Sequence, residues 1–112
     1  MTELREPTFL VLAALADGRK HGYAIIAVAA DISGGRVQLK AGTLYAALER
    51  LEADGLIEKA GDEVVDGRLR RYYDLSDQGA AVLADEAARQ QENAAAATQR
   101  LRARSIRVAA AQ

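Results

Sequence analysis

The sequence predicts a mainly α-helical fold with one β-hairpin, in the order helix, helix, helix, strand, strand, helix. Apolar residues recur at helical spacing before residue 55. Two short β-rich segments flank a polar, glycine-containing loop, which is typical of a hairpin. A long segment without proline or glycine follows Gly79. This order, ααα-ββ-α, is that of a winged helix-turn-helix domain with a long C-terminal helix, and 112 residues suffice for one such domain.

Three helices are expected before the hairpin. The first spans about residues 6–17 and begins at Pro7, since proline fits the first helical turn without losing a needed hydrogen bond. The second spans about 22–32, and one of its faces carries Tyr23, Ile26, Ala27 and Ala30. The third spans about 41–54, and its buried stripe is Leu44, Ala47, Leu48 and Leu51.

The hairpin and the last helix complete the expected fold. Strands are predicted at 56–59 and 71–75, with turn residues at 61–67 between them. The last helix begins after Ser76, a good N-cap, and extends to about Arg104. Such a length exceeds what the core of a small domain can cover, and a long terminal helix usually needs a partner. We therefore expect a domain at 1–75, a dimerisation helix at 76–104 and a flexible tail at 105–112.

One face of the last helix is expected to be the dimer interface. Alanine allows another helix to approach closely, and leucine anchors both ends. The interface residues at helical spacing are Leu83, Ala87, Gln90, Ala94 and Leu101. The alternative is a solvated, alanine-rich helix that frays after Ala97.

The composition excludes several kinds of site. The chain has no cysteine and a single histidine, His21, so neither a thiolate site nor a multi-histidine metal site is expected. No Gly-rich phosphate loop follows a strand, and no nucleophile stands at motif spacing from a base, so we expect no enzyme activity, cofactor or metal. No apolar run reaches the roughly 20 residues of a membrane span. The N-terminus lacks signal-peptide features, and we expect a cytoplasmic location.

The net charge of −1 argues mildly against nucleic acid as a partner, because DNA-binding domains usually carry a basic patch. Positive charge is concentrated locally, however, since the segment 68–71 holds three arginines and no acid. Each phosphate neutralised by such a side chain adds to salt-dependent affinity. The alternative is an ordinary charged hairpin edge that deters aggregation.

Four blocks in the right order, from about Phe9 to Leu83, carry a more specific signal. His21-Gly22-Tyr23 forms one, and residues 40–48, 50–57 and 67–79 form the others. They resemble the second helix, third helix and wing of the PadR family of transcriptional regulators. Within that family the chain resembles the members that have a short C-terminal helix. The resemblance implies a dimeric repressor whose third helix reads the major groove of double-stranded DNA while the wing touches the backbone or minor groove. A two-fold dimer implies a roughly palindromic operator.

The expected DNA contacts combine this resemblance with local chemistry. Gly42 lets the main chain approach a phosphate, and free N–H groups at a helix start favour an anion. Thr43 and Tyr45 offer hydroxyls to the phosphates. The DNA-binding residues are predicted to be Lys40, Gly42, Thr43, Tyr45, Arg68, Arg70 and Arg71.

The chain departs from the family pattern in the same region. Relatives usually carry serine, proline and proline where this chain has Lys40, Ala41 and Ala46, and proline where it has Leu69. The helix start is therefore expected to be less rigid. Near-balanced charge around the third helix keeps a protein-binding winged-helix module as the alternative function.

His21, Tyr23 and Tyr45 could each have a structural role in place of a functional one. His21 is expected at the start of the second helix in a structural role, and Tyr23 in packing. Two roles are considered equally for Tyr45, which are covering the core and contacting DNA. No aromatic residue follows Tyr73, so an aromatic sandwich for a small-molecule effector is not expected. An effector, where one exists, would lie against Phe9, Leu12 or an aliphatic surface.

Overall fold

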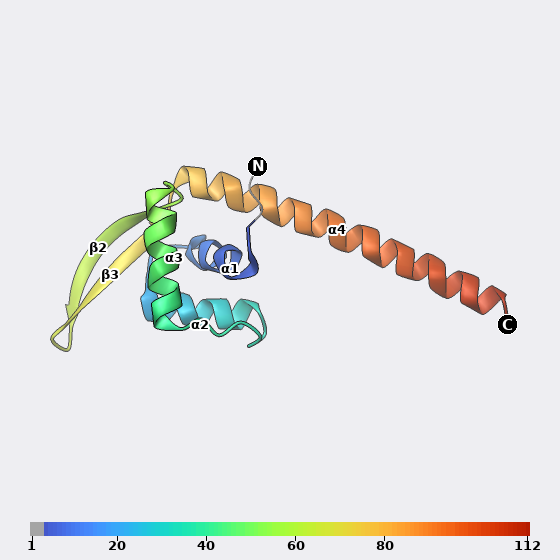
Figure 1. The fold of residues 1–112 in the computed structure, drawn as a ribbon, viewed down its shortest axis with the longest axis horizontal. Coiled ribbons are helices and arrows are strands. Elements are labelled where there is room, and N and C mark those ends of the chain that lie inside the picture. The colour runs from blue at the N-terminus through green and yellow to red at the C-terminus, as the bar shows by residue number, and fades with distance from the viewer. Residues whose placement is uncertain (1–3) are drawn as a thin grey trace.

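The computed structural model describes residues 4–112; residues 1–3 of the expected domain 1–75 lie outside it. The elements confirm the predicted winged helix-turn-helix arrangement and its long last helix (Figure 1). They follow in the order α1 (Glu6–Leu15), β1 (Lys20–His21), α2 (Gly22–Ile32), α3 (Ala41–Ala53), β2 (Ile57–Val65), β3 (Arg68–Leu75) and α4 (Asp77–Ala110). The molecule measures 68 × 28 × 21 Å, because the C-terminal half of α4 projects beyond the other elements (Figure 1).

The core lies where α1, α2 and α3 meet the base of the hairpin. Its largest fully buried side chains are Val11, Leu12, Leu15, Ile25, Leu44, Leu48, Leu51 and Ile57. Burying one such side chain contributes about 1.5–3 kcal/mol, so this cluster fixes α3 relative to its neighbours. The three leucines predicted as the buried stripe of α3 are all in it.

Two expectations about apolar residues are wrong. The buried face of α2 carries Ile25 and Ala29, whereas the side chain of Tyr23 is 71% exposed and does not pack in the core. Almost every residue of α2 is apolar, so spacing alone does not identify its inner face. Leu12, considered as an effector contact, is fully buried in the core and has no surface to offer a ligand.

The hairpin is longer than expected, because the two strands pair from Ile57↔Leu75 to Val65↔Arg68. The turn is therefore Asp66-Gly67 alone and not the segment 61–67. Both turn residues have positive φ, 50° and 75°, which is the pattern of a type I′ turn, and Asp-Gly is a favoured sequence for it. The strand register also shifts between Lys59 and Asp62, which marks a β-bulge.

The sheet has a third strand that was not predicted. The short β1 pairs with β3, so that Lys20 lies opposite Tyr73 and His21 lies opposite Tyr72. Tyr73 is buried and Tyr72 is half-buried, which agrees with the expected alternation along the strand. The wing is thereby joined to the start of α2 through main-chain pairing.

The helix α4 has 34 residues, so it is roughly 51 Å long. Ser76 caps it: its Oγ accepts a hydrogen bond from the N–H of Gly79 at 3.0 Å. The first turns pack on the domain, and Leu83 lies against the core of its own chain. The helix continues to Ala110, past its expected end, so most of the segment 105–112 is helical. No helix within residues 4–112 is both long and apolar enough to cross a membrane.

Candidate nucleic-acid interface

The first turn of α3 is open to solvent. Lys40 occupies the N-cap position with an extended backbone, and its side chain caps no N–H group. Gly42 and Thr43 are exposed, and a Cβ added to Gly42 would meet no atom within 4 Å. The N–H groups of this turn are therefore available to an incoming anion. The absent serine cap, noted in the sequence, leaves this helix start without a side-chain partner.

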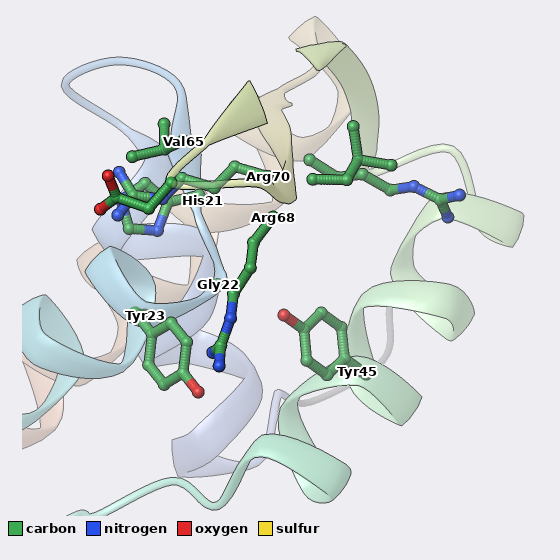
Figure 2. Close-up of a pocket in the computed structure, with 10 residues that line it drawn as sticks. His21, Gly22, Tyr23, Tyr45, Val65, Arg68 and Arg70 are labelled. Carbon is green, nitrogen blue, oxygen red and sulfur yellow. The ribbon is translucent and has the colours of Figure 1, made fainter. Parts of the chain in front are cut away.

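A cleft of about 500 Å³ lies between the start of α2, the side chain of Tyr45 on α3 and the wing. Figure 2 shows Arg68 reaching from the wing into the space between the rings of Tyr23 and Tyr45. Tyr45 is 51% exposed, and Tyr23 is more exposed still. The cleft thus holds a guanidinium and two phenol hydroxyls, and each of these groups can donate a hydrogen bond to an anion. The lining residues are His21, Gly22, Tyr23, Tyr45, Val65, Asp66, Arg68, Leu69, Arg70 and Arg71.

Tyr45 is seated against the first residue of α2. A Cβ added to Gly22 would lie 2.8 Å from Oη and 3.3 Å from Cζ of Tyr45, so only glycine leaves room for this ring. Beside it, His21 caps α2, since its Nδ1 accepts a hydrogen bond from the N–H of Ala24 at 3.4 Å. This is the structural role expected for His21. The His21-Gly22 pair therefore places the Tyr45 side chain at the mouth of the cleft.

The wing arginines differ in what stands opposite them on β2. Arg71 faces Asp62 and Arg70 faces Glu63, so acids lie across the strand from both. Arg68 instead faces Val65. Among residues 4–112, none of the three arginines forms an ion pair, and all three are exposed. Arg68 is therefore the wing arginine without an acid opposite it on β2, and its side chain extends between the two tyrosine rings (Figure 2).

The structure brings together four of the seven residues predicted to contact DNA: Tyr45, Arg68, Arg70 and Arg71 line one cleft. Lys40, Gly42 and Thr43 lie outside the cleft, on the exposed first turn of α3. Sequence reasoning assigned Tyr23 to packing although it belongs to the matched block His21-Gly22-Tyr23, and the structure places it in the lining of the cleft. In the described part of the chain, no group of three or more His, Asp or Glu side chains is arranged to hold a metal ion.

The predicted interface residues of α4 have differing environments. Leu83 and Ala87 are partly buried by their own chain, and the side chain of Gln90 donates to Glu86 at 3.3 Å. Ala94 is exposed, and the side chain of Leu101 is 63% exposed. The C-terminal half of this face is thus exposed to solvent, whereas part of the N-terminal half packs against its own chain.

Comparison with known proteins assigns the family. The model of the transcriptional regulator PadR-like family matches residues 11–85, which include the core, α3 and the whole wing. The chain belongs to the PadR-like family of transcriptional regulators. Residues 86–112 of this PadR-like chain, which form most of α4, lie outside the match.

Curated relatives and solved structures agree with this assignment. A transcriptional regulator of Mycobacterium tuberculosis is 43% identical over 56 residues, and the match covers 50% of this PadR-like chain and 51% of that protein. An uncharacterised transposon protein of Streptomyces fradiae is 49% identical over 63 residues, which are 56% of this chain and only 17% of that protein. The chain therefore spans about half or less of the length of these two relatives.

Among solved structures, a PadR family regulator of Clostridium difficile superposes with a TM-score of 0.68 at 28% identity, over 87% of this chain and 99% of that one. Bacillus subtilis PadR, solved in complex with operator DNA, superposes with a TM-score of 0.64 at 24% identity, over 72% of this chain and 46% of that one. The second likeness shows a shared fold.

Proposed function

We propose that this PadR-like chain is a sequence-specific, DNA-binding repressor that acts as a homodimer in the cytoplasm. The observation that carries the proposal is the cleft in which Arg68 stands between the hydroxyls of Tyr23 and Tyr45, beside the open first turn of α3. The Bacillus subtilis PadR structure contains operator DNA, which supports the same partner here.

The cleft and the helix start suit different parts of a DNA duplex. A guanidinium matches the geometry of a phosphate, and hydroxyls are frequent phosphate donors. We place the backbone of the DNA along the cleft, with Arg68 on a phosphate. The exposed side of α3 then faces the major groove, where Lys40 and Thr43 are the side chains at its N-terminal end that can reach base edges.

The binding test is fluorescence anisotropy with DNA from upstream of the chain's own gene and with a shuffled sequence of equal length, at several salt concentrations. We expect clear preference for the upstream DNA. Arg68→Ala should weaken binding to both sequences and reduce the slope of log K against log salt by about one. The matched control is Arg36→Ala, which removes an exposed arginine that pairs with Glu6, outside both the cleft and α4, and should change neither quantity.

Equal affinity for upstream and shuffled DNA would overturn the proposal and favour the protein-binding module. Repression itself is measured with a reporter gene behind the bound upstream segment. Expression of the chain should lower the reporter signal, and a rise would show an activator instead.

The homodimer is supported by the part of α4 that contacts nothing in its own chain. From residue 91 to residue 112 nearly every side chain is exposed, including the large apolar groups of Leu101, Ile106 and Val108. In proteins most of the stability of a helix comes from packing one of its faces. A second copy supplies that face, and the interface continues the stripe through Ala87, Ala94 and Leu101.

The charges of α4 favour an antiparallel pair. Its first half carries four acids and one base, whereas its second half carries four arginines and no acid. Antiparallel helices bring each acidic half beside the basic half of the partner, and parallel helices bring like charges together. The residues concerned are Asp77, Asp85, Glu86, Arg89 and Glu92 in the first half and Arg100, Arg102, Arg104 and Arg107 in the second.

Single cysteines test this arrangement cleanly, because the chain has none of its own. With the two-fold axis near Ala94, Ala94→Cys should form a disulfide with its own copy, and Ala87→Cys should cross-link to Leu101→Cys in a mixture. Leu101→Cys alone should not, since its two copies would lie about 21 Å apart along the helices, beyond the roughly 7 Å limit between Cα atoms. Ala96→Cys, on the opposite face, is the control.

Self-cross-linking of Leu101→Cys would contradict the antiparallel order while leaving a dimer. A strict monomer by sedimentation at micromolar concentration would refute the dimer altogether. Neither result depends on DNA, so the dimer and the DNA-binding proposal are tested separately.

A further inference from the structure

Arg19, in the loop between α1 and β1, reaches across to the wing. Its Nη1 donates a hydrogen bond to the main-chain oxygen of Ala60 at 2.7 Å. Its guanidinium lies over the ring of Tyr72, with Cζ at 4.4 Å from the ring centre. The same nitrogen would be 3.0 Å from a Cβ built on Gly61, so the side chain lies directly against the main chain there. One arginine thus touches both strands of the hairpin.

The oxygen that Arg19 binds belongs to the β-bulge of β2. The paired register runs to Lys59↔Tyr73 and resumes at Asp62↔Arg71, so Ala60 and Gly61 together lie opposite the single residue Tyr72. A bulge leaves main-chain groups without ladder hydrogen bonds and bends the strand that contains it. Gly61 has φ of 106°, a conformation that side chains rarely allow. Arg19 therefore gives a carbonyl of the bulged segment a side-chain hydrogen bond where the regular pairing is interrupted.

The ring beneath Arg19 is itself held in place. The hydroxyl of Tyr72 donates to Glu63 across the strand at 2.8 Å. The ring of His21 meets the ring of Tyr72 edge to face, with the centres 5.6 Å apart. A guanidinium stacked on an aromatic face gains about 0.5–1 kcal/mol at an exposed site. Arg19 consequently stacks on a ring that is held by Glu63 of the wing and by His21 at the start of α2.

The bulge separates two parts of the wing. Before it, Ile57 is buried in the core. After it, residues 62–64 and 66–71 are exposed, and this distal part carries the cleft-lining arginines. Figure 1 shows the hairpin curving away from the helices toward its tip. The direction of the distal part, and with it the place of Arg68 over the cleft, follows from the bend at the bulge.

We propose that Arg19 is a positioning residue for DNA binding, which clamps the β-bulge and so holds the wing arginines over the cleft. The proposal rests on the proposed DNA-binding function. Whether Arg19 holds the wing in place is measured without DNA. A failure of this geometric part can therefore be told apart from a failure of the DNA-binding proposal.

The geometric test uses a distance between the wing and the body of the domain. Spin labels are attached to Val64→Cys on the exposed wing and Ala84→Cys on α4, in protein diluted with unlabelled copies so that each dimer holds one labelled chain. Arg19→Ala should shift or broaden the distance distribution. The control Arg36→Ala loses an exposed arginine that pairs with Glu6, far from the wing, and should leave the distribution unchanged. An unchanged distribution in Arg19→Ala would overturn the clamp.

The functional test is a double-mutant cycle between Arg19 and Arg68, measured as DNA affinity. Arg19→Ala alone should weaken binding by about tenfold, the loss of one charged hydrogen bond to a phosphate. In the Arg68→Ala background the same change should cost less than about threefold, because the main side chain that it positions is gone. Arg19→Lys should recover part of the affinity, since an ammonium still donates one hydrogen bond and lies over the ring.

A direct contact between Arg19 and DNA gives a different result. Two independent phosphate contacts weaken binding additively, within about a factor of two. Additive losses for Arg19→Ala and Arg68→Ala would therefore overturn the positioning role even where the wing distance changes. A purely structural effect is also excluded by design, because it would lower thermal stability and would not depend on the residue at position 68.

Discussion

Replacing Gly22 by alanine tests whether the second helix positions Tyr45, the tyrosine that we propose contacts DNA. The new Cβ would lie 2.8 Å from Oη of Tyr45, closer than real contacts allow, and 3.3 Å from Cζ, which is tight. Because these atoms form the far end of a half-exposed side chain, the ring can swing away without disturbing the core. Folding stability should therefore change by less than about 1 kcal/mol, and alanine is the better helix former. The position of the hydroxyl is what changes.

The expected loss is in DNA affinity. A hydrogen bond to a charged group contributes about 1.5–3 kcal/mol, and a displaced but flexible tyrosine keeps part of it. We expect Gly22→Ala to lose about 1–2 kcal/mol of binding free energy, which is roughly 5- to 30-fold in dissociation constant. Tyr45→Phe removes the same hydroxyl and should lose a similar amount. The double variant should be no weaker than Tyr45→Phe alone, because the interaction that Gly22 protects has already gone.

Anisotropy titrations of the three variants at one salt concentration measure these effects, and thermal unfolding monitored by circular dichroism checks the fold. Parental affinity for Gly22→Ala alongside weakened binding for Tyr45→Phe would show that the hydroxyl does not depend on Gly22. Parental affinity for both would place Tyr45 in packing alone. Additive losses in the double variant would contradict the coupling between the two residues.

Three further predictions concern stability. Gly79→Ala should destabilise the folded chain by about 2 kcal/mol or more, because its Cβ would lie 2.0 Å from the main-chain oxygen of Leu56, which cannot rotate away. Thermal unfolding measures the loss, and the control is Gly42→Ala, whose Cβ would meet no atom within 4 Å. Ser76→Ala should lose about 1–2 kcal/mol by removing the cap of α4, whereas Ser105→Ala, on its exposed C-terminal part, should lose almost nothing. The hydrogen bond from Arg89 lowers the pKa of Glu86 below 4.5, so its contribution is present at neutral pH and disappears as the pH falls through that lowered pKa. The melting temperature of Glu86→Gln should consequently fall less between neutral pH and about pH 3 than that of the parent chain; an equal fall would contradict this.

The helices were predictable because residues near their ends favour a helix start or stop. Pro7 stands in the first turn of α1, Ser76 caps α4, and Gly55 follows α3 with φ of 77°. The stripe of α3 was predictable because polar residues separate its leucines. The inner face of α2 was not, because an almost uniformly apolar helix has no periodic contrast. Tertiary packing on α1 chooses Ile25 and leaves Tyr23 outside.

The wing was only partly predictable. Asp66-Gly67 is the two-residue turn, and its sequence is a strong hairpin signal, but the acids and glycine at 61–63 resemble turn residues more than a strand. They remain in the strand because each acid stands opposite an arginine of β3. The strand β1 has two residues, too few to produce any alternation in the sequence. Its pairing with β3 depends on a contact distant in the sequence.

The candidate site combines residues that the sequence marks with residues that only the fold brings near. Tyr45 and Arg68 belong to motifs that resemble the family's, so the sequence alone marks them as candidate DNA contacts, and the structure places both in one cleft. Arg19 has no motif, and its importance follows from a bulge whose position depends on the pairing of β2 with β3. Contacts of this kind leave no periodic or local signature in the sequence.

A net charge of −1 is compatible with DNA binding because positive charge is concentrated on the distal wing, where two of the three arginines stand opposite an acid and one does not. Asp62 and Glu63 stand across from Arg71 and Arg70, and attraction across the strands offsets part of what those arginines offer a phosphate. Arg68 faces Val65, so no acid stands opposite it on β2, and the acid nearest to it in the sequence is Asp66 in the turn. Arg68→Ala should therefore weaken DNA binding several-fold more than Arg70→Ala or Arg71→Ala at moderate salt. Equal losses at the three positions would show that the cross-strand acids do not matter.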